Sequence, residues 1–369
     1  MKIGVPKEIK DQEGRVAITP DGARFLIQKG HQVLIETNAG LNSGFSNEHY
    51  QQAGAELVST AAAWAADLVV KVKEPLESEY PYLDRQIIFT YLHLAGVTPS
   101  LTQELLKKGT TAIAYETLED EQGRLPLLAP MSAVAGNIAT LMGGYYLAEF
   151  NQGRGVQLGR VLGKRHGKVV VIGDGVVGQH AAQVGMAMGA NVFVAGIDPV
   201  KMQQTKAAIL PDVEFFLSSP GAIAEHIKDA DLVVGAVLIH GAKAPKIVSE
   251  EMIKSMAKGA VVVDVSIDQG GCIATSKPTS HSNPVFIKYG VIHYCVTNMP
   301  GAYPRTSTIA LADATLPYVL KIADAGKAFL MTDKILVKAI NTYDGKITCK
   351  AVAEGLCMLG SYQPIANFI

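Results

Sequence analysis

The stretch VVVIGDGVVGQHAAQVGMAMGA, residues 169–190, decides the fold class of this 369-residue chain. Its first four residues are apolar and typical of a buried strand, and residues 176–188 predict a helix. Between them Gly173, Gly175 and Gly178 fit the pattern G-x-G-x-x-G. Such glycines permit a tight turn, close approach of the backbone to a pyrophosphate, and close packing of helix on strand. The stretch therefore predicts a dinucleotide site, with Val176 and Val177 where the helix N-terminus faces the phosphates.

A tight turn in a sheet that binds nothing is the alternative, and the surrounding sequence argues against it. Strands alternate with helices in two series. The first series has apolar runs at 2–6, 31–37, 67–73, 86–92 and 111–116, and the second at 168–175, 191–196, 213–218, 230–237, 260–268 and 291–298. Nearly continuous apolar runs are typical of parallel strands buried on both faces.

Two long helical segments, at 131–150 and at 299–326, connect the two series; we expect Pro317 to bend the second. We therefore expect an α/β protein with two doubly wound Rossmann-like domains. A dinucleotide-binding domain, residues 131–302, would be inserted into a discontinuous catalytic domain, residues 1–130 and 303–369.

Composition excludes several classes of function. The chain has 33 Lys and Arg against 34 Asp and Glu, with no long run of either sign, which argues against nucleic acid or an anionic membrane as partner. Its four cysteines form no CxxC pair, so we expect a reducing compartment and no metal site. No run of about 18 apolar residues is present, and the N-terminus is too charged for a signal peptide. A cytoplasmic protein is the expectation.

Four polar residues lie where a ligand of such a sheet is expected, beyond the carboxyl ends of strands. Lys73, His93 and Asp268 follow strands, and Arg15 lies in the loop after the first strand. Two cations, an imidazole and a carboxylate would meet in the cleft between two sheets. We expect them to clamp a substrate that carries a carboxylate beside a nicotinamide.

Each of these residues also has a simpler interpretation. Arg15 could be a solvated loop charge or a partner of Glu13. Lys73 could extend its amine to solvent from a strand end, and His93 could be a hydrogen-bonded core histidine. Asp268, before two glycines, could serve only the turn. Their shared position at strand ends favours a common site.

At these residues the chain resembles the alanine dehydrogenase family, in the superfamily that also holds the soluble nucleotide-binding subunit of proton-translocating transhydrogenase. The resemblance runs from GVPKEIK and RVAITP through VKVKEP, FTYLHLA and LPLLAPMS to DVSIDQGGC, NMPG and ATLPYV. It implies a two-domain subunit, assembled as a hexamer, that interconverts L-alanine with pyruvate and ammonia using NAD. Glyoxylate is a further carbonyl substrate of some relatives. A transhydrogenase subunit or a non-catalytic nucleotide-binding protein are the alternatives, and the set Lys73, His93 and Asp268 favours the enzyme.

The resemblance also implies roles for residues. Arg15 and Lys73 would hold the substrate carboxylate and carbonyl oxygen, with Tyr91 beside them, and His93 and Asp268 would be the acid–base pair. Further positions would line the cofactor: Met131, Ser132, Ser218, Val237, Leu238, Ile267, Asn298 and Met299.

The choice of cofactor depends on ANVFVAGIDPVK, residues 190–201. Its strand is expected to end in an acidic residue that binds the adenosine ribose and repels a 2′-phosphate. Gly196 stands at that position, and Asp198 follows two residues later. Either NADP is accepted alongside NAD, with Lys201 approaching the added phosphate, or Asp198 reaches back to the ribose.

Other departures from the family pattern concern the same domain. Asp174 stands in the glycine loop where a small residue is usual, Asn137 replaces an arginine, and Arg160 and Lys164 precede the loop. We expect these residues to alter cofactor affinity without changing the reaction.

Overall fold

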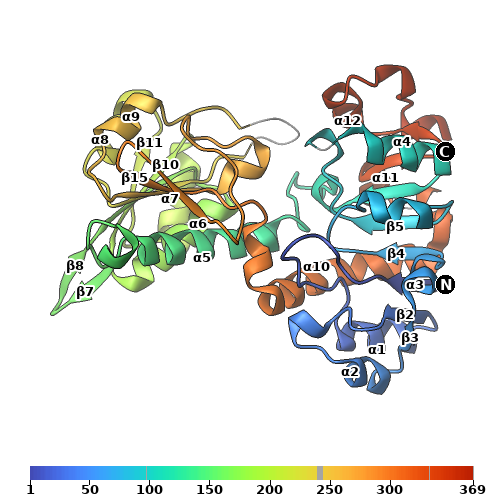
Figure 1. The fold of residues 1–369 in the computed structure, drawn as a ribbon. Helices are drawn as coiled ribbons and strands as arrows, with labels where there is room; N and C mark the ends of the chain where they lie inside the picture. The colour runs from blue at the N-terminus through green and yellow to red at the C-terminus, as the bar shows by residue number, and fades with distance from the viewer. Residues whose placement is uncertain (97, 239–243, 332, 369) are drawn as a thin grey trace. The chain divides into compact units, whose positions relative to one another are not determined.

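The computed structural model describes residues 1–96, 98–238, 244–331 and 333–368. They form two compact units, Met1–Met131 with Gly301–Ile369, and Ser132–Pro300 (Figure 1). Each unit has its own mainly parallel sheet with helices packed on it. The predicted fold class, with two Rossmann-like sheets, is confirmed.

The sheet of the first unit has eight strands in the order β17-β16-β6-β5-β4-β1-β2-β3. The strands from β1 to β6 are all parallel and follow the doubly wound order 3-2-1-4-5-6. Two short strands near the C-terminus, which the sequence reading missed, extend the sheet: β16 pairs antiparallel with β6, and β17 pairs antiparallel with β16. The strands are β1 Lys2–Val5, β2 Gln32–Glu36, β3 Glu56–Val58, β4 Leu68–Val70, β5 Ile87–Thr90, β6 Thr111–Ala114, β16 Ile340–Tyr343 and β17 Lys346–Ile347.

The helices of the first unit cover the two faces of this sheet. Helix α10 packs against β4 and beside α1, whereas α3, α4 and α12 enclose a core around Val69 and Ile88. Local sequence sets the helix ends: Thr19 caps α1, with Pro20 as its first residue, and Gly109 ends α4 in the left-handed region. The helices are α1 Pro20–Gln28, α2 Asn47–Gln52, α3 Thr60–Trp64, α4 Pro99–Lys108, α10 Pro304–Ala325, α11 Lys334–Lys338 and α12 Lys350–Gly355.

The sheet of the second unit has the order β11-β10-β9-β12-β13-β15-β14, in which only β14 is antiparallel. The chain reverses direction across the sheet between β9 and β12, the switch point where doubly wound folds bind ligands. The strands are β9 Lys168–Ile172, β10 Asn191–Gly196, β11 Glu214–Leu217, β12 Leu232–Gly235, β13 Val261–Asp264, β14 Val285–Lys288 and β15 Val291–Tyr294. The helices are α5 Ala129–Tyr146, α6 Val176–Met188, α7 Pro199–Ala208, α8 Pro220–Ile227 and α9 Glu250–Ser255.

A hairpin of β7 (Gly159–Val161) and β8 (Lys164–His166) carries two of the basic residues that depart from the family pattern. The hairpin reaches the C-terminal end of α6, where a Cβ on Gly189 would lie 2.9 Å from the backbone nitrogen of Arg160. Helix α6 has 13 residues and is therefore about 20 Å long. Arg160 thus lies at the opposite end of this helix from the glycine loop, and an effect of Arg160 and Lys164 on cofactor affinity stays a prediction.

No helix among residues 1–96, 98–238, 244–331 and 333–368 is long and apolar enough to cross a membrane.

The packing of α6 on β9 depends on Gly178. A Cβ on Gly178 would lie 1.9 Å from the carbonyl oxygen of Gly173, whereas a Cβ on Gly175 would meet no atom within 4 Å. Helix propensity alone predicts that Gly178→Ala raises the free energy of unfolding by about 1 kcal/mol. Because the contact is with backbone, we instead expect it to destabilise by about 2 kcal/mol.

Urea unfolding followed by circular dichroism measures this effect, with Gly175→Ala as the matched control. The midpoint should fall for Gly178→Ala and stay near wild type for the control. An unchanged midpoint for Gly178→Ala would contradict the close packing.

Candidate functional site

Arg15 is a buried cation with a fixed orientation. Its side chain is 2% exposed, and its Nε and Nη2 donate to the two carboxylate oxygens of Glu13 at 2.7 and 2.5 Å. Nη1 lies 3.1 Å from the sulfur of Met131. Burial would lower the pKa of Arg15, but Glu13 holds it above its usual value. The interpretation of Arg15 as a solvated charge is therefore wrong, and the pairing with Glu13 is confirmed.

Lys73 lies in the loop after β4, and a buried carboxylate holds that loop in place. Glu8 Oε1 accepts hydrogen bonds from the backbone nitrogens of Val72 and Lys73, at 2.6 and 3.3 Å. The hydroxyl of Thr90, at the end of β5, donates to the Lys73 carbonyl at 3.1 Å. Lys73 itself is buried, so the interpretation of a lysine that extends into solvent does not fit.

A second lysine, Lys71, which the sequence reading missed, forms an ion pair with Glu8 and holds it in place. The fully buried amine of Lys71 lies 3.2 Å from Glu8 Oε2 and 3.0 Å from Glu79 Oε1. Burial would lower the pKa of Lys71, but the two carboxylates raise it above its usual value. Burial raises the pKa of Glu8, and Lys71 opposes that rise. The cluster thus ties the loops after β1 and β4 together.

Tyr91 and His93 follow β5, and their rings stack 5.6 Å apart with planes only 3° from parallel. Tyr91 is buried and donates its hydroxyl to the Leu127 carbonyl at 2.5 Å. Burial raises the pKa of Tyr91, an effect that the nearby charge of Arg15 opposes. The structure therefore brings Arg15, Tyr91 and His93 together in one unit.

The backbone of His93 is left-handed, with φ 47°, which is unusual for a residue other than glycine. The carboxylate of Glu116 accepts from the backbone nitrogens of Leu92 and His93, the second at 2.6 Å. The same carboxylate lies 4.0 Å from His93 Nδ1. The imidazole is 42% exposed, so the core interpretation of this histidine is wrong. Glu116 therefore positions an accessible imidazole.

The glycine loop of the second unit has the shape that a dinucleotide needs. Gly173 has φ 113°, and a Cβ there would lie 2.5 Å from the carbonyl oxygen of Ala236, in the loop after β12. The space beside Gly175 is open to 4 Å, and no side chain caps the N-terminus of α6. Backbone N–H groups at such a terminus bind phosphate. The predicted NAD pyrophosphate fits this loop.

A fully buried carboxylate also shapes the loop that carries Asp268. Asp264, the last residue of β13, accepts hydrogen bonds from the backbone nitrogens of Ser266, Cys272 and Ile273 at 3.0 to 3.2 Å. Asp268 is exposed on the short 3-10 helix Val265–Gln269, which Gly270 ends with φ 91°. Asp268 therefore lies in a turn that Asp264 holds, and Asp268 is exposed to solvent.

The thiol of Cys272 lies beside Asp264, and burial, with that carboxylate, raises its pKa to about 12. It is a structural group in this loop.

The predicted cofactor residues at the end of β10 have different surroundings. Gly196 is buried, and its carbonyl accepts from the Ser218 nitrogen at 2.7 Å. Asp198 caps α7, since its Oδ1 accepts from the nitrogens of Val200 and Lys201 at 2.9 and 3.3 Å. The side chain of Asp198 is thus engaged by its own helix.

The remaining predicted cofactor residues are spread over several loops. The hydroxyl of Ser266 bridges the nitrogen and carbonyl of Val237 at 3.0 and 2.8 Å. Ile267 and Met299 are buried, and Asn298 is left-handed with φ 58°. Four exposed apolar side chains lie at the carboxyl ends of the strands or in the loops and helix that follow them: Val176, Ile197, Leu217 and Leu238. Apolar side chains of this kind can pack against an aromatic base. Ser132 lies on α5 and is half-buried.

Sequence reading missed the carboxylates that hold these loops, Glu8, Glu116 and Asp264. Two signals were available: Lys71 in LVVKVK and Asp264 in VVVDV are charges inside apolar runs of the sequence. A charge in such a strand requires a buried partner.

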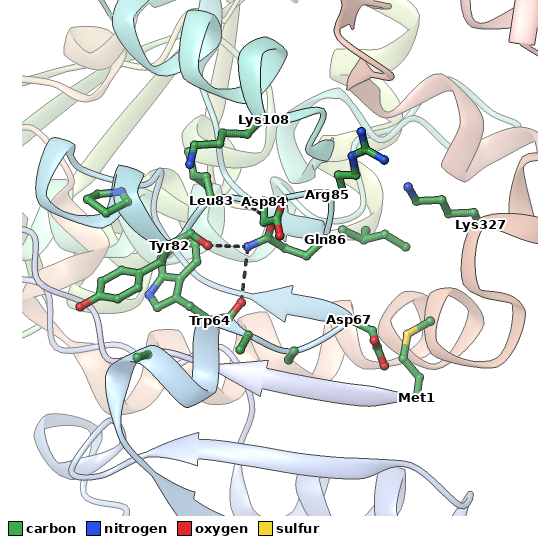
Figure 2. Close-up of a pocket in the computed structure, with 15 residues that line it drawn as sticks. Met1, Trp64, Asp67, Tyr82, Leu83, Asp84, Arg85, Gln86, Lys108 and Lys327 are labelled. Carbon is green, nitrogen blue, oxygen red and sulfur yellow. Dashed lines mark hydrogen bonds between the residues drawn. The ribbon is translucent and has the colours of Figure 1, made fainter.

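A hollow of about 830 Å³ in the first unit lies at the opposite, amino edge of its sheet. Trp64, Asp67, Arg85, Lys108 and Lys327 line it (Figure 2). Gln86 spans it by donating to the carbonyls of Tyr82 and Trp64. None of the predicted site residues borders this hollow.

Within the described part of the chain, no three His, Cys, Asp or Glu side chains gather as metal ligands.

Comparisons with known proteins cover nearly the whole chain. The family model "Alanine dehydrogenase/PNT, N-terminal domain" matches residues 4–135, and "Alanine dehydrogenase/PNT, C-terminal domain" matches residues 139–350. "Alanine dehydrogenase 2" of Staphylococcus aureus (strain USA300) is 48% identical over 362 residues, 97% of each chain. An alanine dehydrogenase of Staphylococcus epidermidis is 48% identical over 359 residues, 96% of each chain.

Solved structures agree with these matches. An L-alanine dehydrogenase superposes with a TM-score of 0.93 at 45% identity, covering 97% of this chain and 100% of that one. A transhydrogenase from Sinorhizobium meliloti superposes with a TM-score of 0.81 at 24% identity, covering 95% of this chain and 100% of that one. The second likeness is one of fold alone.

The buried cluster around Lys71 generates a stability prediction. Glu8→Ala removes one of the two carboxylates that face the Lys71 amine. It also removes the acceptor of the backbone N–H groups of Val72 and Lys73. We expect it to destabilise the protein by about 3 kcal/mol, because a partly unpaired buried charge and unsatisfied amides remain.

Urea unfolding measures the loss, with Glu104→Ala as control because Glu104 pairs with Lys107 on the surface of α4. The control should unfold at the wild-type midpoint. Equal midpoints for both variants would show that the cluster does not hold the loops.

Proposed function

The chain belongs to the alanine dehydrogenase/PNT family, and from this premise we propose that it catalyses the reversible oxidative deamination of L-alanine to pyruvate and ammonia with NAD. The observation that carries the proposal is the 48% identity to curated alanine dehydrogenases over 97% of the chain. The chain is thus an NAD-dependent amino-acid dehydrogenase. We assign the catalytic role to the unit Met1–Met131 with Gly301–Ile369, and dinucleotide binding to the unit Ser132–Pro300.

Arg15 and Lys73 are proposed to bind the substrate. A guanidinium offers a planar fork that matches a carboxylate, and Glu13 fixes its plane before substrate arrives. Lys73 supplies a point charge that polarises the carbonyl oxygen and stabilises a carbinolamine. Tyr91 stays neutral in its buried position and holds the imidazole of His93 by stacking.

His93 and Asp268 are proposed to move protons. NAD, when bound, accepts the hydride from the α-carbon of alanine. The resulting iminium adds water to give a carbinolamine, which loses ammonia to form pyruvate. Water addition and ammonia loss both need proton transfer at oxygen and nitrogen, and an imidazole exchanges protons readily near neutral pH. Both side chains are exposed and able to reach a ligand.

The glycine loop and the exposed apolar side chains at the edge of the second sheet support NAD as the cofactor. Use of NADP was the alternative that Gly196 left open. The surroundings of Asp174, described below, favour NAD.

We further propose a hexamer in the cytoplasm. The family resemblance supports the hexamer. All four cysteines are free thiols, as expected for a reducing compartment.

The activity is tested by following NADH oxidation by the purified chain with ammonium and either pyruvate or glyoxylate. Turnover should require both ammonium and the oxo acid. NADH oxidation without an oxo acid, or none with either, would contradict the proposal. A transhydrogenase subunit needs no residues such as Arg15 and Lys73 to hold an amino acid, so it would show no turnover that depends on pyruvate and ammonium.

Lys73→Ala and His93→Ala test the assignment of the site. Each should lower kcat/KM for pyruvate by about 10²–10⁴-fold, through loss of carbonyl polarisation and of proton transfer respectively. Because both residues lie in the unit without the glycine loop, the Kd for NADH should stay near wild type. Lys107→Ala, on the surface of α4, is the control. Full turnover of either variant would exclude its residue from the site.

A further inference from the structure

We propose that Asp174, in the glycine loop, binds the adenosine ribose of NAD and excludes the 2′-phosphate of NADP. The proposal rests on the proposed function, in which NAD is the cofactor. In domains with a G-x-G-x-x-G loop, this role belongs to an acidic residue at the end of the second strand. That strand is β10, and it ends in Gly196.

The space that a side chain at position 196 would enter is already filled. A Cβ on Gly196 would lie 3.2 Å from the carboxyl carbon of Asp174, and 2.7 and 2.8 Å from Cγ and Sδ of Met202. The carboxylate of Asp174 therefore lies where the side chain of a strand-end acid would begin. The missing Cβ of Gly196 is what makes room for it.

The carboxylate of Asp174 has capacity for a further donor. Its Oδ1 lies 3.4 Å from the amine of Lys201, whereas its Oδ2 is buried without a hydrogen-bond partner among the described residues. The side chain of Asp174 is only 10% exposed. A buried carboxylate oxygen without donors is costly, and the hydroxyls of a ribose are donors of the required kind.

Asp198, the rival candidate, already has a structural task. Its Oδ1 accepts the first two hydrogen bonds of the α7 cap. Turning the Asp198 side chain back towards the ribose would break the cap of α7, which typically contributes about 1 kcal/mol to stability. The structure thus favours Asp174 over Asp198 as the ribose ligand.

Lys201 completes the discrimination between cofactors. Because its amine faces Asp174, its positive charge is offset and is a poor partner for a 2′-phosphate. A phosphate placed beside Asp174 would be repelled. Removing Asp174 would release Lys201 and convert a site that rejects the phosphate into one that attracts it.

The test measures the Kd of NADH and NADPH separately by fluorescence titration of the purified enzyme. For Asp174→Ala we expect the Kd of NADH to rise about tenfold and the Kd of NADPH to fall, so that the preference for NADH is lost. Adding Lys201→Ala should abolish the gain for NADPH. Asp174→Asn keeps the shape, so it should relieve repulsion of NADPH with a smaller loss for NADH.

Two further variants make the assignment specific. Asp174→Ala with Gly196→Asp and Met202→Ala moves the carboxylate to the strand end, since Met202 would otherwise lie 2.7 Å from the new Cβ, and should restore the preference for NADH. Asp229→Ala breaks another aspartate–lysine pair, with Lys168 at the opposite edge of the same sheet, and should leave the ratio of the two Kd values unchanged.

Failure of this proposal is distinguishable from failure of the proposed function. An unchanged Kd ratio in Asp174→Ala, or a loss of NADH preference in Asp198→Ala instead, would overturn the role of Asp174, whatever the enzymatic activity. If Asp174→Ala shifts the Kd ratio but wild type shows no turnover with pyruvate and ammonium, the ribose assignment stands and the proposed reaction is wrong. Circular dichroism and thermal unfolding confirm that each variant is folded.

Discussion

A carboxylate that accepts backbone N–H groups holds each of the loops on which the proposed chemistry depends. Glu8 bonds the loop that carries Lys73, Glu116 the turn that carries His93, and Asp264 the turn that carries Asp268. Charge-assisted bonds of this kind are about twice as strong as bonds between neutral groups. The backbone of each of these loops is therefore held in one shape. These three residues explain why loops at strand ends in both units have a defined backbone.

The parts of the molecule that follow from short stretches of sequence were predictable. Apolar runs located the parallel strands except β3, and the glycines at 173, 175 and 178 located the loop at the switch point of the second sheet. Lys73 and His93 follow strands of the first sheet and Asp268 follows a strand of the second, as predicted, whereas their roles stay a prediction. Apolar runs did not reveal β16 and β17, because β16 (INTY) has two polar residues among its four and β17 has only two residues.

Contacts between distant segments were not predictable. Glu8 is 64 residues from Val72, and nothing in GVPKEIK shows which loop its carboxylate will meet. His93 lies in an apolar run, so its exposure depends on a left-handed turn that Glu116, 23 residues later, stabilises. The sequence showed that Gly196 stands where an acidic residue is expected and that Asp198 is the next acidic residue along the chain. The replacement that the fold offers, Asp174, belongs to another segment.

The contact between Gly196 and Asp174 also constrains how this site can change over evolutionary time. An acid at both positions would place two carboxylates against each other, and an acid at neither would leave the ribose without an acceptor. Substitutions at the two positions are therefore epistatic, and neither is neutral without the other. A lineage that moves its ribose acceptor from strand to loop must pass through a poorer binder, or change both codons together. We therefore expect residues 174 and 196 to change together among relatives.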